Sequence, residues 1–143
     1  MDASTITTYK AGMLQAQAHR SLNVMKNNIL KPYGISIMQW VVLGAVYDAG
    51  SAGIRTSDLA QKLSTTLAFI TNTVNLLEAK EFVYKTANTE DSRSKLIKFE
   101  LKRSEMFLQI EQEVRKRLRE TVYSKITREE LNTYLSVITK FAA

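Results

Sequence analysis

Residues 56–101, TSDLAQKLSTTLAFITNTVNLLEAKEFVYKTANTEDSRSKLIKFEL, decide the fold because the spacing of apolar residues changes within them. In the first half, apolar residues recur every three or four positions, which predicts two short helices joined by the tight turn STT. The second helix has a polar open face, as in a helix-turn-helix motif. In the second half, FVYKT and KLIKFEL alternate apolar and polar residues around ANTEDSRS, which predicts a β-hairpin, or wing.

Helices are also predicted on both sides of this segment, because one proline and five glycines leave few helix breakers. Apolar residues at helical spacing indicate one helix over about residues 5–30 and two beyond residue 102. Capping boxes pair Ser36 with Gln39 and Thr127 with Glu130. Thr56 and Thr66 are expected to cap the two central helices. The predicted fold class is mainly α with a small β-hairpin.

The predicted organisation is a central DNA-binding domain bracketed by helices. Residues 35–101 are expected to form the winged helix-turn-helix. Residues 1–34 and 102–143 carry more apolar helical surface than this small domain needs. We therefore expect them to form a helical dimerisation region.

Composition narrows the class of partner. The net charge is +6 and the isoelectric point is near 9.6, which favours polyanions. Cysteine is absent, so disulfides and cysteine metal sites are excluded. Apolar runs are far shorter than the roughly 20 residues of a membrane span, and the polar start is not typical of a signal peptide. We expect a cytoplasmic protein without a membrane partner.

The wing tip combines acids with an arginine. Arg93 at a hairpin tip suits the narrow minor groove of A·T-rich DNA, where negative potential is concentrated. Asp91 lies two residues earlier and can pair with the guanidinium to fix its direction. The alternative is a solvated polar turn with a surface ion pair worth under about 1 kcal/mol.

Two further groups are candidates for DNA contact. The base-reading group lies on or before the second central helix, where Asn can bond adenine and apolar groups can meet thymine methyls. It comprises Thr65, Thr66, Leu67, Thr71, Asn72 and Asn75. The candidate phosphate contacts are Arg55, Lys62, Lys85, Lys95 and Lys98. The alternative for the base-reading group is an ordinary exposed polar helix face, with Thr65 and Thr66 serving mainly as helix caps. The alternative for the phosphate contacts is that these side chains are simply solvated.

An apolar pocket with a few polar groups is the candidate effector site. Its expected residues are Met13, His19, Arg20, Tyr33, Trp40 and Tyr47. Arg20 could meet a carboxylate through two hydrogen bonds. The alternative is that the aromatic residues are core and that His19, the only histidine, is a surface or interface residue. Enzyme signatures are missing, so we expect no catalytic site, metal or cofactor.

The sequence resembles the MarR family of bacterial winged-helix transcriptional regulators, because it contains four motifs of that family in the same order: QWVVL, LAQKL, LLEAKEFV and EDSRSKLI. The resemblance covers nearly the whole chain. It implies a homodimer joined by the first and last helices, with recognition helices in major grooves and wings in minor grooves. It also implies a small aromatic or anionic effector, bound between the dimer helices and the DNA-binding lobe.

The sequence also departs from the family pattern. Leu67, Asn72 and Leu76 occupy positions where the family often has arginine, so the operator cannot be inferred from relatives. Glu81 replaces the usual glycine of the exit turn. Because a residue with a side chain disfavours positive φ, we expect that turn to be less sharp.

Two functional interpretations follow. The favoured one is a dimeric, sequence-specific regulator, most simply a repressor, that binds a pseudo-palindromic operator in double-stranded DNA and is relieved by a ligand. The alternative is a winged-helix protein-interaction module or nucleoprotein scaffold, which the arginine-poor recognition helix favours.

Overall fold

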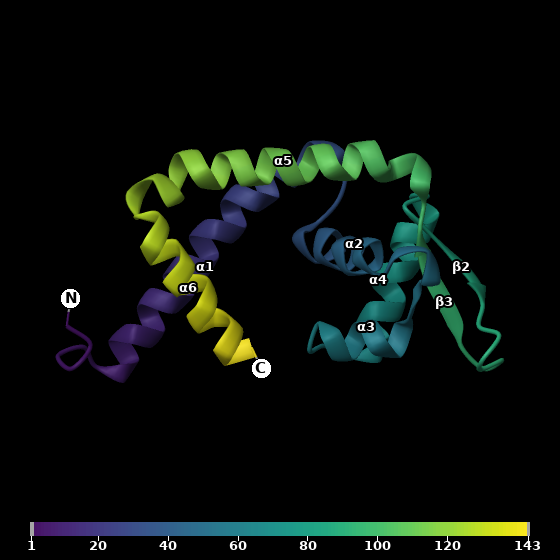
Figure 1. Cartoon of the computed structure of the whole chain (residues 1–143), viewed down its shortest axis with the longest axis horizontal. Coiled ribbons are helices and arrows are strands. Elements are labelled where there is room, and N and C mark those ends of the chain that lie inside the picture. Colours follow the sequence, from purple (N-terminus) through teal and green to yellow (C-terminus); the bar gives the residue numbers. More distant parts are fainter. Residues whose placement is uncertain (1, 143) are drawn as a thin grey trace. The chain divides into compact units, whose positions relative to one another are not determined.

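The structure, a computed structural model, describes residues 2–142 (Figure 1). The chain divides into two compact units, Met1–Glu105 and Met106–Ala143. The helices and strands of the first unit are α1 (Thr8–Leu30), α2 (Ile37–Ala49), β1 (Ile54–Arg55), α3 (Thr56–Lys62), α4 (Leu67–Ala79), β2 (Val83–Ala87) and β3 (Lys95–Phe99). Short 3₁₀ turns follow α1, α2 and β3 at Lys31–Tyr33, Gly50–Ala52 and Leu101–Arg103.

Local hydrogen bonds start the helices, mostly where the sequence predicts. Ser36 and Gln39 form the expected capping box of α2, at 3.1 and 3.2 Å. Thr66 caps α4 by accepting from the Phe69 N–H at 3.1 Å. The predicted cap of α3 at Thr56 is wrong, because Arg55 is the residue with extended backbone before that helix and makes no side-chain capping bond.

The core of the first unit lies where α2 packs against α4 and β3, and where α3 packs against α4. These four elements, the start of β2 and the residue before it supply the buried apolar side chains, which are Val42, Leu43, Val46, Leu59, Ile70, Val74, Leu77, Phe82, Val83, Ile97 and Phe99. Ile70, Val74 and Leu77 of α4 are thus on the buried face, as their helical spacing predicts. Tyr47 packs its ring edge-on against Phe99, with the ring centroids 5.1 Å apart.

The hairpin is part of a three-stranded antiparallel sheet in the order β1-β3-β2. β2 and β3 form the predicted wing, with Lys85 opposite Ile97, and their loop is seen at the far right of Figure 1. β1, which the sequence analysis missed, pairs Ile54 with Ile97. Gly53, just before β1, has a φ of 73°, and a Cβ there would lie 2.9 Å from the Ile97 carbonyl oxygen. The third strand therefore depends on glycine at this position.

The exit from α4 differs from the expectation of a less sharp turn. Glu81 adopts a φ of 62°, the left-handed conformation that glycine would take. The turn is held from outside: Arg103 donates to the carbonyls of Lys80 and Glu81 at 2.9 and 3.3 Å and lies over the Phe82 ring. These contacts offset the strain of a left-handed residue with a side chain.

The second unit contains most of α5 (Ser104–Thr121), a 3₁₀ turn (Tyr123–Lys125) and α6 (Arg128–Ala142). The predicted capping box is present, with Thr127 and Glu130 exchanging hydrogen bonds of 2.9 and 3.0 Å. α6 exposes a large part of its apolar stripe, at Tyr134, Leu135, Ile138 and Phe141.

α1 likewise exposes apolar side chains along its first two thirds, among them Tyr9, Met13 and Leu14. Among residues 2–142, no single helix is long and apolar enough to cross a membrane. The stretches Thr8–Tyr33 and Ile37–Ala52 meet that test of length and composition only as a pair, bent by 76°.

Candidate nucleic-acid interface

α3 and α4 form the helix-turn-helix, and the turn between them is built from local hydrogen bonds. Ser64 has a φ of 52°, which reverses the chain, and the Thr65 N–H donates to the Ala60 carbonyl at 3.0 Å. The Thr66 hydroxyl is occupied as the cap of α4. Thr65 is half-buried and Thr66 is exposed. Both residues therefore lie at the start of α4, where the sequence analysis places them.

α4 presents two kinds of side chain to solvent. Thr71, Asn72 and Asn75 are exposed, as predicted. Leu67 and Leu76 are also exposed, at 55% and 53%. The Thr71 hydroxyl donates to the Leu67 carbonyl at 2.9 Å, so its proton is used within the helix. The helix therefore offers amides and apolar groups to a partner.

The side-chain amide of Asn75, unlike that of Asn72, is hydrogen-bonded to a residue of the wing. The Lys85 ammonium on β2 donates to Asn75 Oδ1 at 2.7 Å and lies 3.3 Å from Glu78 Oε1. Lys85 thus connects the wing to α4. Within the part of the chain that the structure describes, the Asn72 amide has no such partner.

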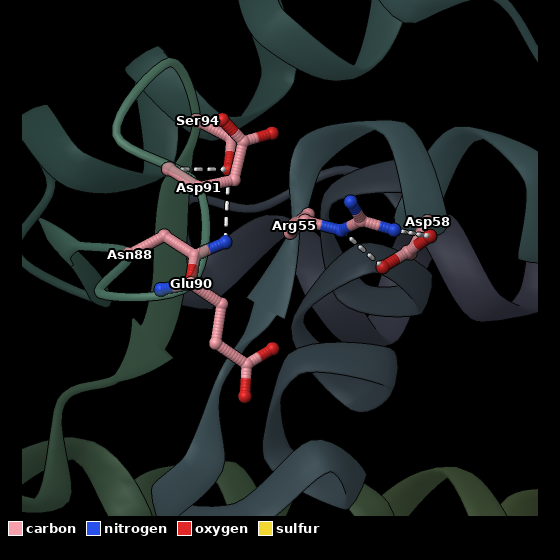
Figure 2. A network of polar contacts seen from close by, with 6 residues as sticks. All are labelled: Arg55, Asp58, Asn88, Glu90, Asp91 and Ser94. Atoms are coloured by element: carbon pink, nitrogen blue, oxygen red, sulfur yellow. Dashed lines mark hydrogen bonds and ion pairs between the residues drawn. The ribbon is translucent and has the colours of Figure 1, made fainter.

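The wing tip is organised by hydrogen bonds around Asp91. One carboxylate oxygen of Asp91 accepts from the backbone N–H and the Nε of Arg93, at 3.0 and 3.3 Å. The Ser94 hydroxyl donates to the Asp91 carbonyl and accepts from the Asn88 amide, as Figure 2 shows. Asn88 also accepts from the Glu90 N–H. The Arg93 side chain is 92% exposed, so an ordered loop carries a guanidinium in solvent.

A second arginine is paired with an acid at the start of α3. Arg55 donates to both oxygens of Asp58, at 2.9 and 3.1 Å, as seen at the right of Figure 2. These hydrogen bonds raise the pKa of the Arg55 guanidinium and lower the pKa of the Asp58 carboxyl. Asp91 and Glu90 act in the same direction on the pKa of Arg55 through their charges.

A hollow of about 340 Å³ lies between α4, the start of α3 and the wing. Its charged lining is wholly basic among the described residues. The lining residues that can donate hydrogen bonds to an anion include Arg55, Asn75, Lys85, Arg93 and Lys95. The structure thus brings one face of α4 and the basic wing residues around a single surface, whereas Lys62 and Lys98 do not line it.

A second hollow, of about 580 Å³, has the opposite character. It is lined by Asp58, Glu90 and Asp91, together with Arg55. Three acids near the wing therefore line the second hollow, and no acidic residue is among those that line the basic hollow.

A comparison with protein families identifies this arrangement. The model of the MarR family matches residues 35–95, which begin two residues before α2 and end at the first residue of β3. Residues 35–95 belong to the MarR family. The family resemblance stated from the sequence is thus confirmed for this segment.

Solved structures extend the likeness along the chain. A cysteine-to-serine mutant of MarR from E. coli, complexed with operator DNA, is 25% identical, with a TM-score of 0.81 over 91% of each chain. A MarR family regulator from Rhodococcus sp. RHA1 is 18% identical, with a TM-score of 0.85 over 96% of this chain and 97% of that one. CouR from Rhodococcus jostii RHA1, bound to p-coumaroyl-CoA, is 19% identical, with a TM-score of 0.81 over 92% and 91%. A search of curated proteins gave no significant match.

The residues predicted for an effector pocket lie before residues 35–95 or, for Trp40 and Tyr47, within them. Met13, His19 and Arg20 are exposed on α1, where His19 contacts the Asn23 amide at 3.0 Å. Tyr33, Trp40 and Tyr47 are half-buried, Tyr33 in the turn after α1 and the other two on α2. None of the six lines the two hollows beside the wing. Their role remains a prediction.

Sequence reasoning missed the residues that support the MarR segment. The Lys80 ammonium, at the end of α4, donates to the Gly34 carbonyl and to Gln39 Oε1, joining residues more than 40 positions apart. Asn88 was interpreted only as part of a polar tip. Its position three residues before Asp91 in a tight turn was the available signal, because Asn and Asp bond their own turns. Within residues 2–142, no group of three or more histidine or acidic residues could hold a metal.

Proposed function

We propose that this protein is a dimeric, sequence-specific DNA-binding transcriptional regulator of the MarR type, acting as a repressor that a small ligand relieves. The observation that carries the proposal is the basic hollow between α4 and the wing, where Arg55, Lys85, Arg93 and Lys95 converge. Phosphate contacts supply much of the affinity for DNA, and the base edges supply sequence information. The basic hollow provides the phosphate contacts, and the exposed face of α4 provides the contacts to base edges.

The likeness to MarR in complex with operator DNA supports the DNA-binding interpretation over the protein-interaction module. The opposite charges on the two sides of the wing support it further. A duplex strand is attracted to the basic hollow and repelled by the hollow lined with Glu90 and Asp58. The acids of this basic chain therefore orient the wing on DNA.

Arg93 is the proposed minor-groove contact. Its guanidinium is nearly fully exposed, and Asp91 limits the directions that it can take. Asn72 and the apolar groups of Leu67 and Thr71 are the proposed contacts to base edges, because amides bond adenine and apolar groups meet thymine methyls. Thr65 and Thr66 place the first N–H groups of α4 near a phosphate.

Dimerisation is proposed to use residues 1–34 and 102–143. The exposed apolar residues of α1 and α6 are typical of surfaces that another chain covers. Two copies would place two α4 helices on one side of the duplex, about 34–36 Å apart for successive turns of the major groove. A ligand that favours one dimer shape would change this spacing and lower the affinity for DNA.

The effector is proposed to be a small aromatic or anionic molecule. CouR, a protein of the same fold, binds p-coumaroyl-CoA. Trp40 is the only tryptophan, so its fluorescence reports directly on the proposed pocket. A saturable change on titration with p-coumaroyl-CoA or benzoate, absent with coenzyme A alone or acetate, would support an aromatic ligand.

The decisive experiment is selection of bound sites from fragmented genomic DNA, followed by gel shifts at several salt concentrations. We expect a pseudo-palindromic site, and log affinity should fall with log salt by about 0.9 for each phosphate contact. Failure to enrich any site, with no shift of duplex DNA at low salt, would overturn the proposal.

A further inference from the structure

The amide of Asn75 has an orientation that its neighbours determine. Lys85 Nζ donates to Asn75 Oδ1 at 2.7 Å, and Glu78 Oε1 lies 3.3 Å from the same ammonium. Because an ammonium can only donate, it must face the oxygen of the amide and not its NH₂ group. The NH₂ group of Asn75 is therefore the part left for a partner.

This orientation disfavours recognition of adenine. An Asn that reads adenine accepts from the N6 amino group while it donates to N7. At Asn75 the oxygen already accepts from a positively charged donor, whose charge opposes the approach of a second donor. The pair Asn75–Lys85 consequently presents hydrogen-bond donors, which match groups that only accept.

The position of Asn75 on α4 indicates which acceptor it meets. Leu67, Thr71 and Asn75, four residues apart, line the basic hollow between α4 and the wing. Arg55, at the end of β1, and Arg93 and Lys95 of the wing line the same hollow. Asn72 is exposed on α4 but does not line it. A phosphate of the strand that separates the two grooves is the anion that fits such a surface.

We propose that Lys85 holds Asn75 as a hydrogen-bond donor to a backbone phosphate, so that Asn72 is the amide of α4 left to read a base. This inference rests on the proposed function and adds a division of labour within the recognition helix. It removes Asn75 from the base-reading group that the sequence predicts.

Interference footprinting with the full-length protein on its selected site tests the inference. We expect ethylation of one phosphate in each half-site to block the wild type but not Asn75→Ala. Asn75→Ala should lower affinity about three- to tenfold while leaving the base preference at every position unchanged. Asn72→Ala should instead relax the preference at one position of each half-site.

Two more variants separate the role of Lys85 from general damage. Asn75→Asp keeps an oxygen for Lys85 but faces the phosphate with a carboxylate, so it should bind more weakly than Asn75→Ala. Lys85→Met frees the oxygen of Asn75 and should add a preference for adenine at one position. Melting temperatures of all variants should stay close to that of the wild type.

The outcomes are distinguishable. If Asn75→Ala abolishes a base preference, Asn75 reads a base and the inference is wrong. The same conclusion follows if binding of Asn75→Ala is no longer sensitive to methylation of guanine N7 but is still sensitive to phosphate ethylation. If the wild type binds no duplex site at all, the proposed function itself fails.

Discussion

A single oxygen of Asp91 accepts from both the backbone N–H and the side-chain Nε of Arg93, at 3.0 and 3.3 Å. The acid therefore restrains the start and the end of the arginine side chain together. Asn88 and Ser94 close the loop behind it. An exposed guanidinium that is held in one direction loses less entropy on binding than a free one.

Arg93→Ala is expected to lower operator affinity by at least about tenfold, because each half-site then lacks its minor-groove arginine. The melting temperature should not fall, since the side chain is 92% exposed. The slope of log affinity against log salt should decrease by about 0.9 for each phosphate that the variant no longer neutralises. Gel shifts and thermal melts measure these effects, with Arg93→Lys as the control that keeps the charge. Unchanged affinity of Arg93→Ala would contradict the assignment.

Asp91→Ala should weaken operator binding by a smaller factor, about two- to fivefold, because an exposed ion pair contributes at most about 1 kcal/mol. The loss of affinity caused by Asp91→Ala should require the Arg93 side chain to be present. In a double-mutant cycle, Asp91→Ala should have no further effect once Arg93 is alanine. If Asp91→Ala instead strengthened binding in both backgrounds, the acid would act only through repulsion of DNA.

Glu81→Gly should raise stability by about 0.5–1 kcal/mol, because Glu81 sits at a φ of 62° where glycine carries no steric penalty. Chemical denaturation followed by circular dichroism measures the change. Glu81→Ala is the matched control: it removes the same exposed ion pair with Lys102 but keeps the strained conformation, so it should not stabilise. Equal effects of the two variants would show that φ strain is not the cause.

Much of the fold could be predicted because it depends on local sequence. The capping boxes at Ser36 and Thr127 and the inward residues of α4 follow from spacings of three or four residues. β1 could not be predicted, because two residues are too few to show alternation and their partner Ile97 lies more than 40 residues away. Its dependence on Gly53 became visible only with β3 in place.

In the candidate site, too, the local contacts could be predicted from the sequence and the contacts between distant residues could not. Asp91 and Arg93 are two residues apart, so their contact was readable from sequence. The contact of Lys85 with Asn75 joins a strand to a helix, and its consequence for the amide is a matter of geometry. The conformation of Glu81 was mispredicted because Arg103, from beyond the hairpin, holds the turn.

Ile138→Glu should disrupt the proposed dimer, since it places a charge in the exposed apolar stripe of α6. We expect the dimer dissociation constant to rise by at least about tenfold, and operator binding to weaken with it. Analytical ultracentrifugation of both proteins gives the measurement. Ser136→Glu, an exposed polar position in the same helix, is the control and should remain dimeric. A wild-type protein that is monomeric throughout would refute the dimer.

The Arg55–Asp58 pair should make stability depend on acidity. The pKa of Asp58 is lowered by hydrogen bonds from Arg55, so the folded state binds this proton less readily than the unfolded chain. The stabilisation is therefore present above the unfolded value of about 3.9 and is lost as the pH falls through the lower folded value. The melting temperature of the wild type should exceed that of Asp58→Asn at pH 7, and the gap should close on acidification below about pH 4. A gap that stayed constant from about pH 7 to about pH 3 would mean that the charge of Asp58 does not contribute.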